Sequence, residues 1–236
     1  MFTKNIKFKN FTKNKNNKIN KFLRNILKEK SLVEKYPLLE SLNKNYKYSY
    51  QKKEIKFFNR FSEFNLVGMG GSILGAETIY NFLNHKINKK FNFYNNLNFK
   101  NIPKTNKKNI NIVISKSGNT LETISNFNLL LQKQKENKNI ILCEDKKNFL
   151  RTLGKKLKAE IFEHKNYIGG RYSVLSEVGM LPAELMGLNE KKFKRFNYLV
   201  NNKYFINSLI KNVISINNFI KKGKTNLVIL NYDEKS

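Results

Sequence analysis

Between residues 61 and 162 the hydrophobic positions change repeatedly between two spacings. Short apolar runs rich in β-branched residues are typical of buried strands, and apolar residues at every third or fourth position are typical of helices. The predicted strands are 64–68, 91–94, 110–115, 138–143 and 159–162. The predicted helices are 72–83, 120–134 and 147–157. This alternation indicates right-handed βαβ crossovers, so we expect an α/β fold: a three-layer, doubly wound parallel sheet flanked by helices.

The two ends of the chain differ from this central region. Residues 1–60 place apolar positions at helical spacing, so we expect a helical N-terminal arm; these positions include Ile19, Phe22, Leu23, Ile26 and Leu27. We expect one domain over 61–190, followed over 191–236 by a helical connection and the strand Asn226–Asn231. That strand has the pattern of the start of a second α/β domain. A buried parallel strand without a following helix is incomplete, so we expect the chain to be cut short relative to the complete protein.

The most obvious global feature of the 236 residues is a formal net charge of +29. Such an excess could indicate nucleic-acid binding. Two observations favour a compositional drift toward Lys, Asn and Ile instead. The basic residues are spread along the whole chain, and arginine is scarce, with only Arg24, Arg60, Arg151, Arg171 and Arg195. We therefore expect no specific nucleic-acid partner, although the positive field would help to attract a phosphorylated ligand.

Composition also bounds the class of protein. Hydrophobic residues make up 40% of the chain, which excludes a mainly disordered protein. No apolar run reaches the roughly 18 residues of a membrane span, and the N-terminus lacks the apolar core of a secretory signal. The single cysteine, Cys143, lies in an apolar run and is interpreted as a core residue. It fits a reducing cytosol, so we expect a cytoplasmic protein with no membrane partner; no Cys/His spacing suggests a metal site.

A glycine-rich loop, Gly68-Met-Gly-Gly-Ser-Ile-Leu-Gly75, follows the first predicted strand. Its glycines would let backbone N–H groups approach a ligand, and Ser72 is placed to cap the following helix. The loop is not a Walker loop, because no Gly-Lys-Ser/Thr follows. Ile73 occupies the place of the third glycine in the G-x-G-x-x-G dinucleotide fingerprint. A tight strand-to-helix turn without a ligand remains the alternative.

A second loop, Ser115-Lys-Ser-Gly-Asn-Thr120, follows the third predicted strand and precedes a helix. The hydroxyls of Ser115, Ser117 and Thr120 can donate to phosphate oxygens, and Gly118 permits an unusual backbone turn. The free N–H groups and the positive dipole end of the following helix favour an anion. Three hydroxyls around a glycine exceed what helix capping alone requires. The sequence therefore predicts a phosphate-binding loop, with an N-capped helix as the alternative.

A third constellation is Gly169-Gly-Arg-Tyr-Ser173. Two glycines before an arginine form a tight or mobile loop that presents a permanent cation, and Arg171 could stabilise an oxyanion that develops during a reaction. A surface ion pair is the alternative for Arg171. The two histidines, His85 and His164, are interpreted as structural, although His164 lies close to this loop in the sequence.

Taken together, these loops resemble the phosphoglucose isomerase family, whose members are built from two sugar isomerase (SIS) domains. The resemblance covers about residues 64–190. Its most specific part is Gly169-Gly-Arg-Tyr-Ser-Val-Leu-Ser176 with Val178-Gly-Met-Leu-Pro-Ala183, which is similar to the family signature around a catalytic arginine. The other two loops also occur, loosely, in other SIS proteins.

The resemblance implies an aldose–ketose isomerisation of glucose 6-phosphate and fructose 6-phosphate through an enediolate, without a metal or cofactor. It implies a hexose 6-phosphate substrate and a homodimer for the full-length protein. Arg171 would be catalytic, stabilising the enediolate and positioning water. The phosphate would be bound by Ser115, Lys116 (through its backbone), Ser117 and Thr120. The sugar would be bordered by Gly71, Ser72 and Gly170.

The chain departs from the family pattern in two places. Gly118-Asn119 stands where many members carry Phe-Thr, which leaves the phosphate role but weakens the assignment of the sugar. The family's proton-transferring glutamate lies in a Gln-Leu-x-x-Glu-Ser-x-Gly-Lys segment, and its ring-opening histidine and a late lysine come further on; none of them is in this chain. We therefore expect the chain alone to be inactive. A non-catalytic SIS module that binds phosphosugars and a nucleic-acid-binding protein are the alternative functions.

Overall fold

The computed structural model describes residues 21, 25, 32–97, 109–133, 137–195, 202–224 and 226. The chain divides into two compact units, of which one contains residues 37–192 and the other contains residues 1–36 and 193–234. Apart from isolated positions, the helix predicted around Ile19–Leu27 and the strand predicted at Asn226–Asn231 lie outside the described residues. The unit of residues 37–192 holds all three sequence motifs and is described first.

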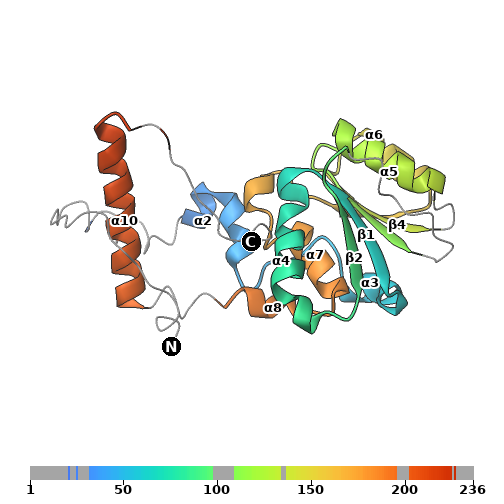
Figure 1. The fold of residues 1–236 in the computed structure, drawn as a ribbon, viewed down its shortest axis with the longest axis horizontal. Coiled ribbons are helices and arrows are strands. Elements are labelled where there is room, and N and C mark those ends of the chain that lie inside the picture. Colours follow the sequence, from blue (N-terminus) through green and yellow to red (C-terminus); the bar gives the residue numbers. More distant parts are fainter. Residues whose placement is uncertain are drawn as a thin grey trace. The chain divides into compact units, whose positions relative to one another are not determined.

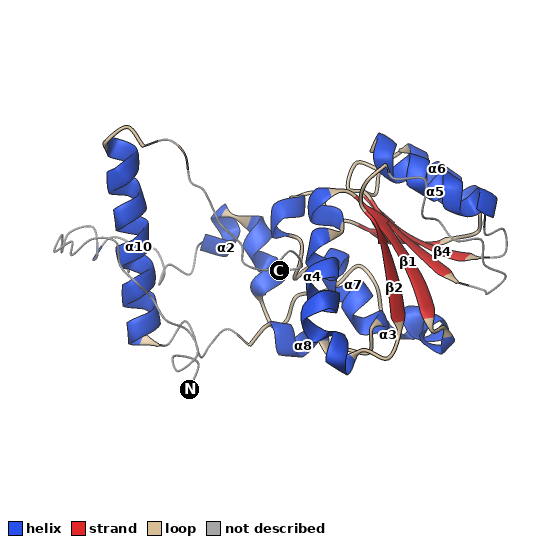
Figure 2. Cartoon of the chain, viewed as in Figure 1, coloured by secondary structure: helices blue, strands red, loops and turns tan. Residues whose placement is uncertain are grey.

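A five-stranded sheet forms the centre of this unit (Figure 2). The strands are β1 (Glu63–Gly68), β2 (Lys90–Tyr94), β3 (Ile110–Ile114), β4 (Lys138–Cys143) and β5 (Glu160–Glu163). Their order across the sheet is β2-β1-β3-β4-β5, and every neighbouring pair is parallel. The predicted α/β class with a parallel sheet is thus confirmed, including the strand at 91–94, which forms one edge.

Helices cover both faces of the sheet, as expected for strands that are buried on both sides. Helices α4 and α7 lie on one face, and α5 and α6 lie on the other (Figure 1). Their bounds are α4 (Leu74–Leu83), α5 (Leu121–Lys133), α6 (Phe149–Lys156) and α7 (Glu177–Leu185). Shorter segments are η2 (Pro37–Leu42), α3 (Lys52–Ile55), η3 (Lys56–Arg60), η4 (Gly70–Ser72), η5 (Asn84–Lys86), η7 (Gly170–Tyr172) and α8 (Glu190–Phe193).

The core between the sheet and helices α5 and α6 follows from the alternation of side chains along each strand. Val67, Val113 and Ile141 occupy paired positions on β1, β3 and β4 and are fully buried. They belong to one apolar cluster with Phe127 of α5 and Leu150 of α6. The helical spacing that predicted α5 and α6 therefore marks the faces that these helices bury.

Two residues before this apolar layer, the same face of the sheet carries a row of asparagines. Asn92, Asn65, Asn111 and Asn139 are paired in register on β2, β1, β3 and β4. Each amide donates to the next: Asn92 Nδ2 to Asn65 Oδ1 at 3.1 Å, Asn65 Nδ2 to Asn111 Oδ1 at 2.9 Å, and Asn111 Nδ2 to Asn139 Oδ1 at 2.9 Å. We call these four side chains the asparagine row.

The asparagine row places polar groups in the interior of the sheet. Asn65 and Asn111 have no exposed surface, and Asn139 is also buried. A buried amide without a partner costs about 1–3 kcal/mol, whereas a paired amide is tolerated. Because side chains alternate between the two faces, a slip of one residue between two neighbouring strands would break the amide pair between them and turn the amide of the shifted strand toward the other face. The row therefore helps to specify the register of the sheet.

The segment before β1 lies in the same compact unit as the sheet. Its described part consists of η2, α3 and η3, separated by a stretch around Tyr46–Tyr50 without regular helix. The Ser49 hydroxyl donates to the backbone oxygen of Glu163, at the end of β5, at 2.6 Å. The segment is therefore attached to the strand that forms the second edge of the sheet.

The other compact unit contributes α2 (Leu32–Lys35) and α10 (Lys203–Lys221). Helix α10 begins after Asn202, whose side chain accepts a hydrogen bond from the backbone N–H of Phe205 at 2.9 Å, as an N-cap does. Together with α8, it accounts for the helical segments predicted up to about residue 222. Within the described part of the chain, no helix combines the length and the apolar character that crossing a membrane requires.

The asparagine row makes a prediction about stability. Asn111→Leu removes the acceptor of Asn65 and the donor to Asn139, so the free energy of unfolding should fall by about 2–4 kcal/mol. Urea unfolding of the 236-residue chain measures this loss. Asn92→Leu is the matched control at the half-buried end of the row. It removes the donor to only one buried group, Asn65 Oδ1, so it should cost about 1–2 kcal/mol, less than Asn111→Leu. Equal losses in the two variants would contradict the role given to the row.

Candidate functional site

The path of the chain through the sheet creates one favoured place for a ligand. From β1 the chain passes through α4 to β2 on one side, and it later returns to β3 on the other side of β1. In open α/β sheets, ligands bind beyond the carboxyl ends of the strands where the strand order reverses in this way. Gly68 at the end of β1 pairs with Ile114 at the end of β3, so the two loops that follow leave the sheet side by side.

The loop after β3, residues 115–120, turns its hydroxyls toward one another. Ser115 is buried, and its Oγ lies 2.9 Å from Oγ1 of Thr120, at the start of α5. The Ser117 hydroxyl is exposed and accepts a hydrogen bond from the backbone N–H of Asn119 at 3.2 Å. Among the described residues, no backbone N–H donates to Thr120 Oγ1. Helix capping therefore does not explain this hydroxyl, which remains close to the helix N-terminus, where an anion is favoured.

A neighbouring loop, residues 144–150, holds the 115–120 loop in place from the side of β4. The backbone N–H groups of Glu144 and Leu150 donate to the carbonyl oxygens of Lys116 and Gly118, both at 3.0 Å. The N–H of Phe149, the first residue of α6, donates to Asn119 Oδ1, also at 3.0 Å. These bonds satisfy two backbone carbonyls of the loop and the Asn119 side chain without using the hydroxyls of Ser115, Ser117 and Thr120.

Gly118 is required by the geometry of this loop for two reasons. Its φ is +67°, a backbone conformation that residues with a side chain rarely adopt. A Cβ atom at this position would lie 2.1 Å from Oδ1 of Asn148. Asn148 cannot move without cost, because this oxygen caps α6 by accepting from the N–H of Arg151 at 2.8 Å. The conformation of the turn at Gly118 and the start of α6 therefore depend on each other.

The glycine loop after β1 contacts the loop that contains Arg171. A Cβ atom on Gly71 would lie 2.2 Å from the carbonyl carbon of Gly170, so the two backbones touch. The Ser173 hydroxyl reaches both loops, donating to the Gly170 oxygen at 2.7 Å and lying 3.2 Å from the Gly71 oxygen. Val174 fills the space beside Gly75, where a Cβ atom would come within 2.8 Å of its side chain. The three motifs found in the sequence are thus linked through the ends of β1 and β3.

Arg171 and Ser72 directly follow the two glycines, Gly170 and Gly71, that are in contact. Arg171 is exposed, and within the described residues its guanidinium has no hydrogen bond or ion pair. The surface ion pair considered as the alternative for Arg171 is therefore not present among these residues. Ser72 lies in the η4 turn, and α4 is preceded by Ile73 with no side-chain cap. The expectation that Ser72 caps α4 is thus wrong: the extra turn of 3-10 helix displaces the serine from the capping position.

The charged and titratable groups around the 115–120 loop come mainly from β4 and β5. Glu144 forms ion pairs with Lys146 and, at 3.9 Å, with the Lys116 ammonium group. His164, directly after β5, is fully buried, and burial lowers the pKa of its imidazole, which keeps it neutral. Burial raises the pKa of the Cys143 thiol, consistent with the core role predicted for it. Lys116 is the basic residue of the 115–120 loop itself.

Sequence reasoning missed two residues that shape this site. Asn148 contacts Gly118 and caps α6, and Ser173 connects the Gly71 and Gly170 backbones. An asparagine at the start of a predicted helix is a capping signal that was available in the sequence; the helix was predicted from residue 147, whereas α6 begins at Phe149. The role of Ser173 carried no such signal, because it depends on a contact between residues about 100 positions apart.

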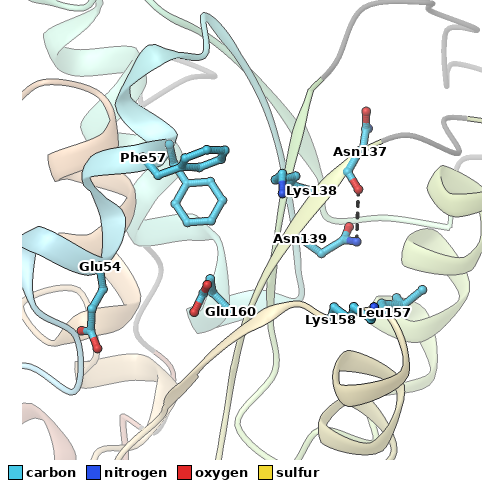
Figure 3. Close-up of a pocket in the computed structure, with 9 residues that line it drawn as sticks. Glu54, Phe57, Asn137, Lys138, Asn139, Leu157, Lys158 and Glu160 are labelled. Atoms are coloured by element: carbon cyan, nitrogen blue, oxygen red, sulfur yellow. Dashed lines mark hydrogen bonds between the residues drawn. The ribbon is translucent and has the colours of Figure 1, made fainter.

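A pocket of about 600 Å³ lies elsewhere, at the amino ends of the strands. Its lining includes Phe57 of η3, Asn139 of β4 and Glu160 of β5, whose side chains surround it in Figure 3. Asn139 is a member of the asparagine row, which lies toward the opposite end of the strands from the 115–120 loop. Open α/β sheets bind their ligands at the carboxyl ends. The loops after β1 and β3, rather than this pocket, are therefore the candidate site.

Comparisons with known proteins found a matching family model and similar sequences. The family model described as phosphoglucose isomerase matches residues 52–232. A curated protein of Methanococcus maripaludis named probable glucose-6-phosphate isomerase is 30% identical over 246 aligned positions, covering 93% of this chain and 54% of that protein. The chain spans about half the length of the curated relatives it matches.

Two solved structures share the fold. A hypothetical protein from Thermus thermophilus gives a TM-score of 0.62 at 18% identity and covers 85% of this chain and 52% of its own. The tagatose-6-phosphate ketose/aldose isomerase of Escherichia coli gives a TM-score of 0.50 at 12% identity and covers 80% and 53%. At these identities the likeness concerns the fold alone, and it confirms the predicted SIS-type sheet.

Gly118 provides a test of the loop geometry. Gly118→Ala should destabilise the chain by about 2–3 kcal/mol, because it combines backbone strain with the clash at Asn148. Gly187→Ala is the matched control: Gly187 has a φ of +86° but nothing lies within 4 Å of its Cβ position, so the variant carries the strain alone. Thermal unfolding of both variants measures the difference. Equal losses would show that the close approach of Asn148 contributes nothing.

Proposed function

Because the chain belongs to the phosphoglucose isomerase family, we propose that its site binds the hexose 6-phosphate of a glucose-6-phosphate isomerase. The single observation that carries this proposal is the meeting of three loops at the reversal of strand order. The 115–120 loop offers hydroxyls and helix-end N–H groups, which suit a phosphate. The Gly71–Gly170 contact puts the arginine turn beside the end of the neighbouring strand.

We assign the phosphate of the substrate to Ser115, Lys116, Ser117 and Thr120, with Lys116 contributing its backbone. Ser115 and Thr120 already lie within hydrogen-bond distance of each other, so their oxygens are positioned to face one ligand group. The sugar would lie along Gly71, Ser72 and Gly170. The close contact with the Gly170 backbone leaves no room for a side chain at Gly71. A small, strongly hydrated ligand such as a sugar suits a surface made largely of backbone.

We assign the catalytic role to Arg171. Isomerisation between the aldose and the ketose passes through an enediolate, and a guanidinium that is not engaged in another ion pair can stabilise the developing oxyanion. The arginine is exposed and, among the described residues, has no ion-pair partner to compete with a substrate. The conversion moves a proton between C1 and C2 and needs neither a metal nor a cofactor in this proposal.

The proton transfer itself needs a base, which the resemblance places in a segment that the 236 residues do not contain. A positioned base is worth about 10²–10⁴-fold in rate. We propose that the whole protein is the isomerase and that this chain alone binds the substrate with little or no turnover. The second candidate is a non-catalytic phosphosugar-binding module, favoured by the same loop geometry without the base.

We further propose that the whole protein is a cytoplasmic homodimer that acts in glycolysis and gluconeogenesis. The cytoplasmic location is supported by the single, buried cysteine, which fits a reducing compartment. The dimer and the metabolic role rest on the family to which the chain belongs.

Phosphate binding can be tested with an isosteric variant of the loop. Thr120→Val removes the hydroxyl that is proposed to donate to the phosphate and that lies beside the Ser115 hydroxyl. The affinity for fructose 6-phosphate should fall about tenfold or more, as expected for the loss of a hydrogen bond to a charged group. Titration calorimetry at moderate salt measures the affinity. Thr123→Val is the matched control on the same helix, since the buried Thr123 hydroxyl has no partner among the described residues. Equal affinities for the unmodified chain and both variants would contradict the assignment of the phosphate to the 115–120 loop.

Turnover separates the roles proposed for this chain and for the whole protein. In a coupled assay starting from fructose 6-phosphate, the purified 236-residue chain should show no activity above that of its Arg171→Ala variant. In the whole protein, the same substitution should lower kcat by about 10²–10³. Robust, arginine-dependent isomerisation by the 236-residue chain would mean that the base lies within it. A whole protein that binds the sugar phosphate without isomerising it would favour the binding module.

A further inference from the structure

One buried carboxylate, that of Glu177, is not used by the site as described so far. Glu177 is the first residue of α7 and has no exposed surface. Burying a carboxylate is costly unless its oxygens are paired. Its position at the helix N-terminus compensates part of that cost, because the positive end of the helix dipole favours a negative charge there. The remaining compensation comes from two donors that belong to other segments of the chain.

The first donor is the backbone N–H of Lys165, which lies 3.1 Å from Oε1 of Glu177. This bond joins two positions that are 12 residues apart in the sequence. Between them lies the Gly169-Gly170-Arg171 turn. The Glu177 carboxylate therefore closes the base of the loop that carries the arginine. Closing a loop in this way removes much of the conformational freedom of the residues inside it.

The second donor is the Tyr46 hydroxyl, which lies 2.8 Å from Oε2 of Glu177 in a buried hydrogen bond. Burial and the negative charge of Glu177 both raise the pKa of Tyr46, so the hydroxyl stays protonated and acts as the donor. Tyr46 is itself held in place. The Lys165 ammonium group lies 4.0 Å from the centre of its ring and donates to the backbone oxygen of Lys47 at 2.7 Å.

The rest of the Tyr46 segment is fastened to the same part of the fold. The rings of Tyr46, Tyr48 and Tyr50 follow one another at centroid distances of 5.2 Å, and Tyr50 packs edge-on against Phe162 of β5 at 6.0 Å. Further along, the Lys52 ammonium group donates to Glu190 at 3.0 Å. The Tyr46 hydroxyl is thus presented to Glu177 by a segment that is attached at several points.

We propose that Glu177, held by Tyr46, is a positioning residue that fixes where the loop of residues 165–177 presents Arg171 to the substrate. This inference rests on the proposed function, because it takes Arg171 as the group that meets the sugar. It assigns a role to the segment before β1, which the three sequence motifs left unexplained. It also separates the two halves of the ligand: Glu177 should matter for the sugar, which Arg171 meets, and not for the phosphate, which the 115–120 loop binds.

The test compares two probes, fructose 6-phosphate and inorganic phosphate, on the 236-residue chain and its variants. Glu177→Ala opens the base of the loop and should weaken fructose 6-phosphate binding about tenfold, since small misplacements of a positioning group are costly, while phosphate binding changes less than about twofold. Glu177→Gln retains an acceptor for Lys165 and should restore part of the loss. Tyr46→Phe, which keeps the ring but loses the donor, should shift the ratio of the two affinities in the same direction.

Tyr50→Phe is the matched control, because Tyr50 is a buried tyrosine of the same segment whose hydroxyl is not bonded to Glu177. It should leave the ratio of the two affinities unchanged. A parallel loss of both affinities in Glu177→Ala and Tyr46→Phe would mean a merely structural role and would overturn the inference. If Glu177→Ala fails to fold, Tyr46→Phe decides by the same ratio. Failure of the unmodified chain to bind fructose 6-phosphate would instead count against the proposed function.

Discussion

The side-chain amides of Asn65, Asn111 and Asn139 pair across three buried parallel strands, and each pair holds only in one register. In an apolar layer, a shift of one strand past another changes which methyl groups touch, but it leaves no polar atom unsatisfied. In a row of amides the same shift separates donors from acceptors in the interior, which is far more costly. Hydrophobic packing therefore supplies most of the stability of the sheet, and the asparagine row supplies much of the specificity of its register.

The register of the strands also sets the geometry at their carboxyl ends. The register that pairs Asn65 with Asn111 also pairs Gly68 with Ile114, so it decides where the loops after β1 and β3 begin. From there, short-range contacts complete the arrangement. Gly118 seats against Asn148, and Gly71 seats against Gly170, each with no room for a side chain. A phosphosugar site of the proposed kind needs this accuracy, because much of its surface is backbone that cannot adjust by changing rotamers.

Much of this could be predicted from the sequence, because the relevant signals are local. The apolar runs of β3 and β4 and the spacing in α5 correctly indicated a parallel α/β sheet. The 115–120 loop was recognisable as a candidate ligand-binding loop from its hydroxyls and glycine. The asparagine row was missed, although its signal was present: in β1, β3 and β4 alike, one asparagine stands directly before at least two consecutive apolar residues. Read singly, each asparagine looked like another instance of the compositional bias.

Other features could not have been predicted, for a physical reason. The bond between Tyr46 and Glu177 joins residues 131 positions apart, and no periodicity or motif specifies such a pair. The same holds for Ser173, which reaches a carbonyl 102 positions away. These contacts depend on the tertiary structure, which brings distant segments of the chain together. We propose that the bond between Tyr46 and Glu177 determines where Arg171 lies.

The contact between the 115–120 loop and the start of α6 has a consequence of its own. The N–H groups of Phe149 and Leu150 donate to Asn119 and Gly118, so the first turn of α6 and the loop share their hydrogen bonds. An anion that orders the loop would also order this turn, and by thermodynamic reciprocity whatever stabilises the turn would tighten the hold on the anion. A change in helix α6, which covers one face of the sheet, would therefore alter the affinity of the loop for the anion without any contact with the ligand.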